Sequence, residues 1–255
     1  MKLRSFKFIS VEIFEKDPEI KIISLNRPEV KNAFHPEMIS EITEFFKDEN
    51  LENKSKIIIL KGEGTAFCAG ADLNWMKDMV NYSFEENIED SKKLWNMFEA
   101  IQECQTPVIG IAHGAVFGGA LGLLACCDYV YAEEKTQFCF SEVKLGLAPA
   151  IISGFISRKI PDAFYRPFML SAEIFSSQDS KNIGLIQRIY STKIEDSEVV
   201  KKFSTNGTEA MKETKKLINS LLHNKSPSEQ RDYCSRVITE RRMSQEAQLR
   251  MKKFL

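Results

Sequence analysis

Short apolar runs alternate with amphipathic segments through the first half of the chain. Runs rich in β-branched and aromatic residues predict strands at 8–14, 19–25, 56–60, 108–112 and 128–132. Apolar residues at helical spacing predict helices that begin at Pro36 and cover about 84–104 and 118–126. Asp17-Pro18 separates the first two strands and predicts a hairpin. Because strands and helices alternate, we expect an α/β core in which helices cover a sheet.

The second half of the chain is predicted to be almost entirely helical. After about Ile151, helical patterns cover 151–160, 162–170, 176–183, 207–222 and 227–251. No low-complexity segment or long linker separates the two halves. We therefore expect a β/α core at residues 1–195 that carries a helical region at residues 196–255.

Composition and charge narrow the class of protein. The 255 residues are 43% apolar and 28% charged, with a formal net charge of −1, which is typical of a soluble globular protein. That balance provides no general attraction to nucleic acid or to an anionic membrane. No apolar run reaches the ~18 residues of a membrane span, and acidic residues interrupt the N-terminal apolar stretch. A cytoplasmic protein without membrane or nucleic-acid partners is expected.

The six cysteines favour packing over chemistry. None belongs to a CxxC pair, and no histidine lies at zinc-ligand spacing from them, so no metal site is predicted. Four of the six lie in apolar runs, where a thiol packs as a small hydrophobic group. We expect buried, reduced thiols.

A loop of small residues follows the third predicted strand, from Gly62 to Asp72. Side chains without bulk let a ligand approach the backbone and contact its N–H groups. A phosphate-binding loop would need a lysine and a hydroxyl residue that this segment lacks. A tight turn without a ligand is the alternative. A second cluster, Gly118-Gly119-Ala120, begins the apolar helix at 118–126.

The start of that helix is suited to stabilising negative charge. The first N–H groups of a helix lack internal partners, and the helix dipole favours an anion there. A ligand oxygen that gains charge during a reaction would be stabilised at this point. The alternative is a glycine-mediated contact between packed elements. The spacing of Gly118, Gly119 and Gly122 does not match the dinucleotide-binding fingerprint.

One carboxylate follows an apolar segment. Glu142 comes after Phe138 to Ser141, and partial desolvation there would raise its pKa and suit a general acid or base. A surface or helix-capping role is the alternative. For His113, at the end of a predicted strand, a structural role is favoured. Trp75-Met76 fits either an acyl-pocket wall or ordinary core, and no GxSxG elbow occurs.

Four segments together resemble the enoyl-CoA hydratase/isomerase (crotonase) superfamily. They are LNRPEVKNAF at 25–34, FCAGADLNWM at 67–76, PVIGIAHGAVFGGALGLLACCD at 107–128 and FCFSEVKLGLAPA at 138–150. The resemblance implies a spiral of ββα units followed by helices that trimerise, hence a homotrimer or hexamer. It also implies an acyl-CoA thioester substrate, with coenzyme A as part of the substrate and no other cofactor.

The resemblance also implies roles for particular residues. The oxyanion hole of the family falls on the backbone N–H groups of Ala69 and Gly119, and the proton-transfer group falls on Glu142. Val30 and Lys31 match positions that line the coenzyme A pocket. The remaining positions expected to bind substrate are Gly70, Ala71, Asp72, Gly118 and Gly122.

Gly122 stands where hydratases of the family usually carry a first glutamate. The family's isomerases keep only the downstream glutamate, so Gly122 alone favours an isomerase. The finer sequence resembles bacterial methylglutaconyl-CoA hydratases of leucine catabolism, which also carry glycine here. We therefore expect hydration of a branched-chain enoyl-CoA. A Δ3,Δ2-enoyl-CoA isomerase is the main alternative, and a non-catalytic acyl-CoA- or RNA-binding relative is the third.

Overall fold

The computed structural model describes residues 5–52, 54–191, 198–221 and 226–254. Six described strands form the main sheet, in the order β1-β2-β3-β4-β6-β9. Their bounds are β1 Ile9–Ile13, β2 Ile20–Leu25, β3 Ile57–Gly62, β4 Val108–Ala112, β6 Tyr129–Glu133 and β9 Arg188–Tyr190. β1 and β2 pair antiparallel, as the predicted hairpin requires, and all other neighbours are parallel.

A smaller sheet adjoins the first. It contains β5 (Ala115–Phe117), β7 (Gln137–Cys139) and β8 (Phe175–Ser176), in that order. β5 and β7 are parallel, and β7 and β8 are antiparallel. β5 begins three residues after β4 ends, and α4 (Gly119–Cys126) begins two residues after β5 ends. The chain therefore passes from the main sheet to the small sheet immediately before α4.

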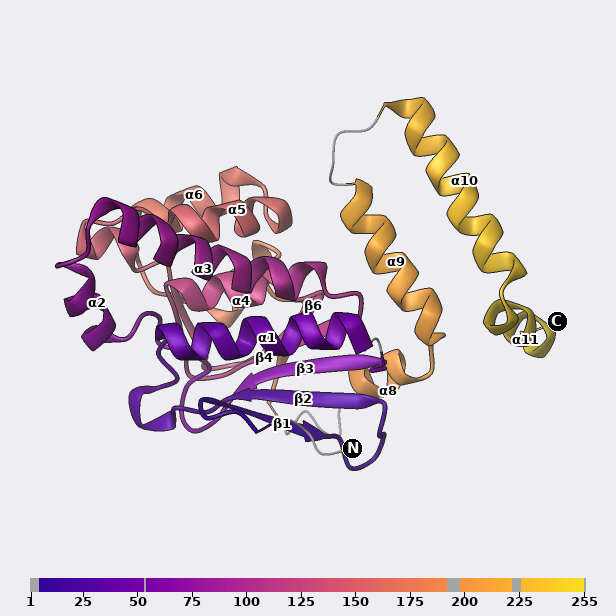
Figure 1. The fold of residues 1–255 in the computed structure, drawn as a ribbon, viewed down its shortest axis with the longest axis horizontal. Helices are drawn as coiled ribbons and strands as arrows, with labels where there is room; N and C mark the ends of the chain where they lie inside the picture. The colour runs from indigo at the N-terminus through magenta and orange to yellow at the C-terminus, as the bar shows by residue number, and fades with distance from the viewer. Residues whose placement is uncertain (1–4, 53, 192–197, 222–225, 255) are drawn as a thin grey trace.

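Helices cover the two faces of the main sheet unequally. α1 (Pro36–Glu52) and α3 (Phe84–Glu103) lie together on one side, with α4 and α5 (Ala150–Lys159) beside α3 (Figure 1). The main core lies between these helices and the sheet. A second apolar cluster on the opposite face joins Ile22, Ile59 and Ile111 to Val200 of α8 (Glu198–Ser204).

Shorter elements connect these layers. They are η1 (Pro28–Val30), α2 (Leu73–Met79), η2 (Glu142–Leu145), α6 (Asp162–Ser171) and α7 (Ser177–Asn182). α7 begins with a capping box in which Ser176 and Asp179 exchange hydrogen bonds. None of the helices in the described part of the chain has the length and hydropathy that a bilayer crossing needs.

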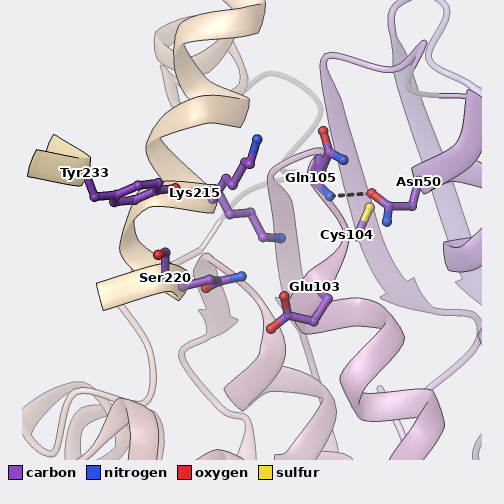
Figure 2. Close-up of a pocket in the computed structure, with 9 residues that line it drawn as sticks. Asn50, Glu103, Cys104, Gln105, Lys215, Ser220 and Tyr233 are labelled. Atoms are coloured by element: carbon purple, nitrogen blue, oxygen red, sulfur yellow. Dashed lines mark hydrogen bonds between the residues drawn. The ribbon is translucent and has the colours of Figure 1, made fainter. Parts of the chain in front are cut away.

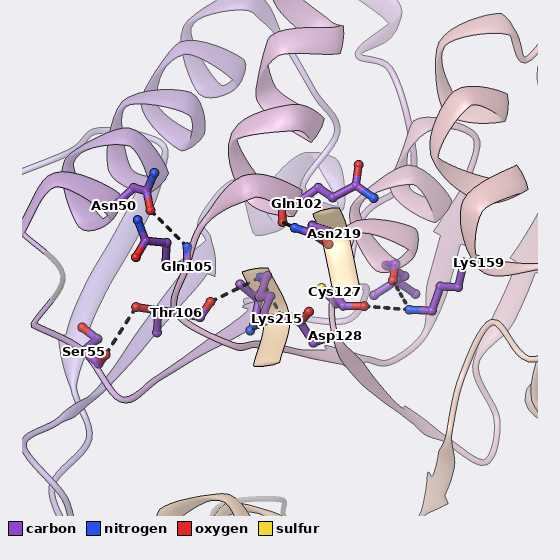
Figure 3. A network of polar contacts seen from close by, with 12 residues as sticks. Asn50, Ser55, Gln102, Gln105, Thr106, Cys127, Asp128, Lys159, Lys215 and Asn219 are labelled. Carbon is purple, nitrogen blue, oxygen red and sulfur yellow. Dashed lines mark hydrogen bonds and ion pairs between the residues drawn. The ribbon is translucent and has the colours of Figure 1, made fainter. Parts of the chain in front are cut away.

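The C-terminal helices form an arm. α9 (Thr208–Leu221), α10 (Pro227–Met243) and α11 (Gln245–Phe254) project from the core (Figure 1). Lys215 attaches α9 to the core, since its ammonium lies 2.7 Å from the carboxylate of Asp128 and donates to Thr106 O at 3.3 Å (Figure 3). The expected boundary between residues 195 and 196 lies outside the described residues.

Most of the elements expected from the pattern are confirmed, often to within one residue. The single helix expected at 227–251 is wrong, because Ser244 adopts extended backbone and separates α10 from α11. The pattern also missed the seven-residue helices α2 and α8. It missed the strands β5, β7, β8 and β9, because two or three residues carry no periodicity. The burial expected for the cysteines is confirmed for Cys68, Cys104, Cys126, Cys127 and Cys139.

Candidate active site

An ion pair joins the loop before α1 to the loop before α2. Arg27 Nη2 lies 2.8 Å from Asp72 Oδ2, and Arg27 Nη1 donates to Ala33 O at 2.6 Å. Asp72 also caps α2, because its Oδ1 accepts from Asn74 N at 2.8 Å. Burial would raise the pKa of Asp72, but the Arg27 guanidinium and the Asn74 and Trp75 amides lower it overall. Asp72 therefore holds the loop, and its expected substrate contact stays a prediction.

Asn32 ties the same loops together through backbone groups. It is fully buried and has a left-handed backbone, with φ 56°. Its Nδ2 donates to Glu63 O and Ala66 O, both at 2.8 Å, and its Oδ1 accepts from Arg27 N at 2.8 Å. Sequence analysis missed this residue. It lies between the strand predicted at 19–25 and the helix predicted from Pro36, where asparagine tolerates this conformation and can replace a backbone pairing partner, but no local pattern indicates which groups it contacts.

The loop at 67–72 pairs with the chain on both sides. On one side, Phe34 N donates to Gly70 O and Asp72 N donates to Phe34 O, both at 2.7 Å. Because Phe34 bonds to the residues that flank Ala71, the N–H of Ala71 points to the other side, and it has no hydrogen-bond partner in the described part of the chain.

That pairing changes the expected oxyanion hole. The N–H of Ala69 donates to Lys31 O at 2.9 Å, so it is already used within the protein. A donor that stabilises developing charge must be free to bond to the ligand. The structure therefore does not favour Ala69 as the first donor, and Ala71, two residues later, has the free N–H.

The other side of this loop meets β5 and brings in the second glycine cluster. Cys68 N donates to Ala115 O and Phe117 N donates to Cys68 O, each at 3.1 Å. Gly70 has φ 97°, and a Cβ there would lie 3.0 Å from Phe117 O. Gly118 and Gly119 follow Phe117 directly, so segments about fifty residues apart in sequence meet at the start of α4.

The glycine pair also adjoins Glu142. Gly118 has φ 53° and ψ −126°, which side-chain-bearing residues rarely adopt. A Cβ on Gly118 would lie 3.2 Å from Ser141 Oγ and 3.4 Å from Glu142 Oε1. Gly119 is the first residue of α4, and its N–H has no partner within the helix. The structure thus brings together the start of α4 and the one predicted proton-transfer group.

The carboxyl group of Glu142 lies in a dry environment. Glu142 is partly buried at the start of η2, and its Oε2 is buried without a hydrogen-bond partner among the described residues. Burial raises the pKa of Glu142 above its usual value, and a hydrogen bond to its own backbone offsets this only in part. A carboxyl with a raised pKa and a free oxygen is suited to accept and return a proton near neutral pH.

The substrate contact expected at Gly122 stays a prediction. Gly122 is buried in α4, and a Cβ there would lie 2.8 Å from the Phe98 ring and 2.9 Å from Ile152. Contacts this short mean that a side chain at Gly122 would displace α3 or α5. The room that a first glutamate would need is occupied by Phe98 and Ile152.

The remaining predicted residues take different places. Val30 and Lys31 are exposed on the loop whose carbonyl accepts from Ala69, and their contact with coenzyme A stays a prediction. His113 is structural, as expected, because its Nε2 lies 3.1 Å from Gly64 O and its carbonyl accepts from Phe67 N. Trp75 is 6% exposed and packs in the main core, which supports the core alternative.

A cavity elsewhere in the molecule shares no residue with this group. It measures about 460 Å³ and lies between the core and the arm (Figure 2). Asn50, Glu103, Cys104 and Gln105 line it from the core, and Lys215, Lys216, Asn219, Ser220 and Tyr233 line it from the arm. Its lining contains neither Glu142 nor the glycine pair that begins α4.

Comparison with known proteins shows the family of this chain. Residues 15–255 match the family described as enoyl-CoA hydratase/isomerase. The chain belongs to the enoyl-CoA hydratase/isomerase family. Its two sheets and covering helices are the crotonase fold, and an enoyl-CoA hydratase from Shewanella pealeana superposes with a TM-score of 0.90 at 32% identity, over 97% of this chain and 93% of that one.

Curated relatives carry both hydratase and isomerase names. The mitochondrial enoyl-CoA hydratase of Pongo abelii is 32% identical over 72% of this chain and 62% of its own length. The peroxisomal Delta(3,5)-Delta(2,4)-dienoyl-CoA isomerase of Arabidopsis thaliana is 28% identical over 76% of this chain and 74% of its own. The chain spans 57–67% of the length of the first curated hydratases that it matches.

Proposed function

We propose that this protein is an acyl-CoA enzyme that adds water across the 2,3 double bond of an enoyl-CoA. The observation that carries the proposal is the buried carboxyl of Glu142, with one oxygen unpaired in the described structure, beside the glycine pair that begins α4. Gly119 and Ala71 provide two N–H groups that no described acceptor uses. One proton-transfer group and two free donors are the parts that an enolate-forming reaction needs.

In the proposed reaction the thioester oxygen gains negative charge as water attacks C3. The oxygen of water bonds to C3, the C2=C3 π bond opens, and its electrons pass to the thioester oxygen. The N–H groups of Ala71 and Gly119 stabilise that charge, and each such donor is worth about 3–4 kcal/mol. Glu142 accepts a proton from the attacking water and returns one to C2, so the protein ends unchanged.

The substrate proposed is 3-methylglutaconyl-CoA, in leucine catabolism in the cytoplasm. Its support is the resemblance of the segments at 117–123, 141–153 and 71–76 to the hydratases of that reaction. Val30 and Lys31 would contact the coenzyme A portion, and the reaction needs no further cofactor.

One observation favours a second candidate, a Δ3,Δ2-enoyl-CoA isomerase. A hydratase with two glutamates uses both to manage water, whereas Phe98 and Ile152 leave no room for a side chain at Gly122. An isomerase needs only one carboxyl, which removes a proton from C2 and returns it to C4. The same free N–H groups would stabilise the same enolate.

The proposed assembly is a homotrimer or a hexamer of this chain. No described residue of α10 is buried. Large apolar side chains exposed on the arm are Ile218, Leu221, Ile238, Met243, Leu249 and Met251. An arm that leaves apolar side chains in water is suited to packing against further copies.

A substrate panel tests the reaction. The pure protein is given 3-methylglutaconyl-CoA, crotonyl-CoA and a 3-enoyl-CoA, and absorbance of the conjugated thioester is followed. Loss of that absorbance with 3-methylglutaconyl-CoA and little change with the others supports the proposal. A gain of absorbance with the 3-enoyl-CoA, without hydration of any substrate, overturns it in favour of the isomerase. No turnover of any of them, with acyl-CoA still bound, would indicate the non-catalytic alternative.

A further inference from the structure

The helix that carries Gly119 has no directional contacts of its own side chains. α4 reads GALGLLAC, and seven of its eight residues are buried. Apolar packing holds this helix in the core, and the close approach of Phe98 and Ile152 at Gly122 restricts its movement. Hydrogen bonds at the two ends add directional restraints on where the first N–H groups point.

Lys159 of α5 holds the C-terminal end of this helix. Its ammonium donates to Leu124 O and to Cys127 O, each at 2.8 Å (Figure 3). Leu124 O also accepts from Cys127 N at 3.3 Å, so the Lys159 ammonium adds a second donor there. The last carbonyls of a helix carry the negative end of the dipole, which favours a cation at this place. Lys159 is partly buried, and it reaches these carbonyls from 32 and 35 residues away in sequence.

A second lysine braces the residue that follows. Asp128 accepts from Val108 N at 2.8 Å and pairs with Lys215 at 2.7 Å. Figure 3 shows Lys159 and Lys215 approaching the Cys127–Asp128 corner from different sides. Lys215 pairs with the side chain of Asp128, which follows the helix. Lys159 instead donates to the carbonyls of Leu124 and Cys127 at the end of α4. Of the two lysines, Lys159 therefore restrains α4 directly.

We propose that Lys159 is a positioning residue for the oxyanion hole. It holds the C-terminal end of α4, so that the N–H of Gly119 at the other end points at the thioester oxygen. The proposal rests on the proposed function, in which Gly119 is a donor. Lys159 bonds to the opposite end of α4 from Gly119, so it acts through the helix and not by contact. A shift of about 1 Å in a helix this short would carry Gly119 out of hydrogen-bond geometry, because the helix moves as one body.

Lys159→Met tests this, with Arg158→Met as the matched control. Arg158 is the adjacent basic residue of α5, but it is exposed and bonds to Gln102, not to α4. We expect K159M to lower kcat about 10- to 100-fold with little change in KM, and R158M to leave both unchanged. Lys159→Arg, which keeps the charge and can donate to both carbonyls, should recover most of the activity.

A spectroscopic readout separates positioning from stability. A saturated acyl-CoA labelled with ¹³C at the thioester carbonyl is bound to each variant, and the chemical shift reports polarisation by the oxyanion hole. We expect a downfield shift with the original protein and with E142Q, and loss of most of it with K159M. An undiminished shift in folded K159M overturns the inference. The absence of any shift in the original protein overturns the proposed oxyanion hole instead.

Folding failure of K159M would not end the test. Lys159→Gln is then measured by the same shift, since its shorter amide can reach at most one of the two carbonyls. An intermediate loss of the shift supports the proposal. A folded K159Q with the full shift and full kcat contradicts it.

Discussion

Two carboxyl groups near the site lie in opposite environments. Asp72 accepts from the Arg27 guanidinium and from Asn74 N, and its pKa falls because these contacts outweigh burial. Glu142 is partly buried with one unpaired oxygen, and its pKa rises. Both residues are acidic side chains close to small residues in the sequence, yet one is structural and the other is suited to move a proton.

The raised pKa of Glu142 has a consequence for stability. Folding disfavours the charged form, so its cost to the folded state is absent below the ordinary pKa of 4.5 and grows as pH rises through the raised value. We expect Glu142→Gln to raise Tm at pH 7–8 by about 2–4 °C, or about 1 kcal/mol. Thermal unfolding across pH 4–8 measures this.

The same variant should abolish turnover, since general acid–base catalysis contributes about 10²–10⁴-fold. Its gain in Tm should shrink toward zero near pH 4, where Glu142 is protonated in both states. A Tm that falls in E142Q, and falls further as pH rises, would show that the carboxylate has a stabilising partner instead. Retention of near-full turnover would mean that another group transfers the proton.

The roles of individual residues differ in how far the sequence could predict them. The apolar flank of Glu142 indicated a raised pKa, and the resemblance to the crotonase superfamily added the proton-transfer role. The role of Asn32 could not be predicted, because it depends on three backbone groups from two loops. The choice between Ala69 and Ala71 likewise depends on which amide Lys31 O accepts, and spacing within a motif carries no information about that.

At the scale of elements, the start of α4 shows how small residues leave the first N–H groups of a helix accessible to a ligand. Gly118 allows a turn with φ 53° and ψ −126°. Because Gly118 has no Cβ, the side chains of Ser141 and Glu142 can lie close to its backbone. We expect Gly118→Ala to cost about 1–3 kcal/mol of stability and most of the activity, because the new methyl group would crowd Ser141 Oγ at 3.2 Å, directly beside the Glu142 carboxyl. Tm and kcat of the purified variant measure both effects.

Gly146 provides the matched control for that substitution. It also has positive φ, at 72°, but a Cβ there would meet nothing within 4 Å. Gly146→Ala should cost about 1 kcal/mol and leave kcat nearly unchanged. Equal losses of kcat in the two variants would contradict a specific role for the space beside Glu142.

Long helices could be predicted from the sequence pattern, whereas the shortest strands could not. α1 and α3 span 17 and 20 residues, and a periodic apolar stripe over that length identifies a helix. β5 has three residues, and its existence depends on pairing with β7. This short strand is nevertheless what delivers Gly118 to the loop that begins at Phe67.

At the scale of the whole molecule, the arm is joined to the core by few polar contacts. Lys215 is 6% exposed and pairs with Asp128, and Asn219 donates to Gln102 O at 3.0 Å. Within the arm, Glu246 of α11 accepts from Glu209 N and Ala210 N at the start of α9. The arm is therefore internally tied, and α9 provides its attachment.

We expect Lys215→Met to loosen the arm without unfolding the core. Removing one partner of a mostly buried pair leaves Asp128 uncompensated and should cost about 2–3 kcal/mol. Hydrogen exchange should quicken in 208–221, while β2, β3 and β4 stay protected. Lys216→Met is the control, because Lys216 is exposed and pairs only weakly with Glu213, at 3.7 Å. Equal exchange in the two variants would contradict the attachment.

The sequence by itself determined the alternation of strands and helices, the small-residue loops and the single carboxylate at Glu142. These features are local, since periodicity and backbone freedom depend on neighbouring residues. Only the tertiary structure decided which amides stay free and that Phe98 and Ile152 fill the space at Gly122. It also showed that Lys159 holds the far end of α4. Hydrogen-bond partners and packing contacts join residues far apart in the chain, and no local pattern records them.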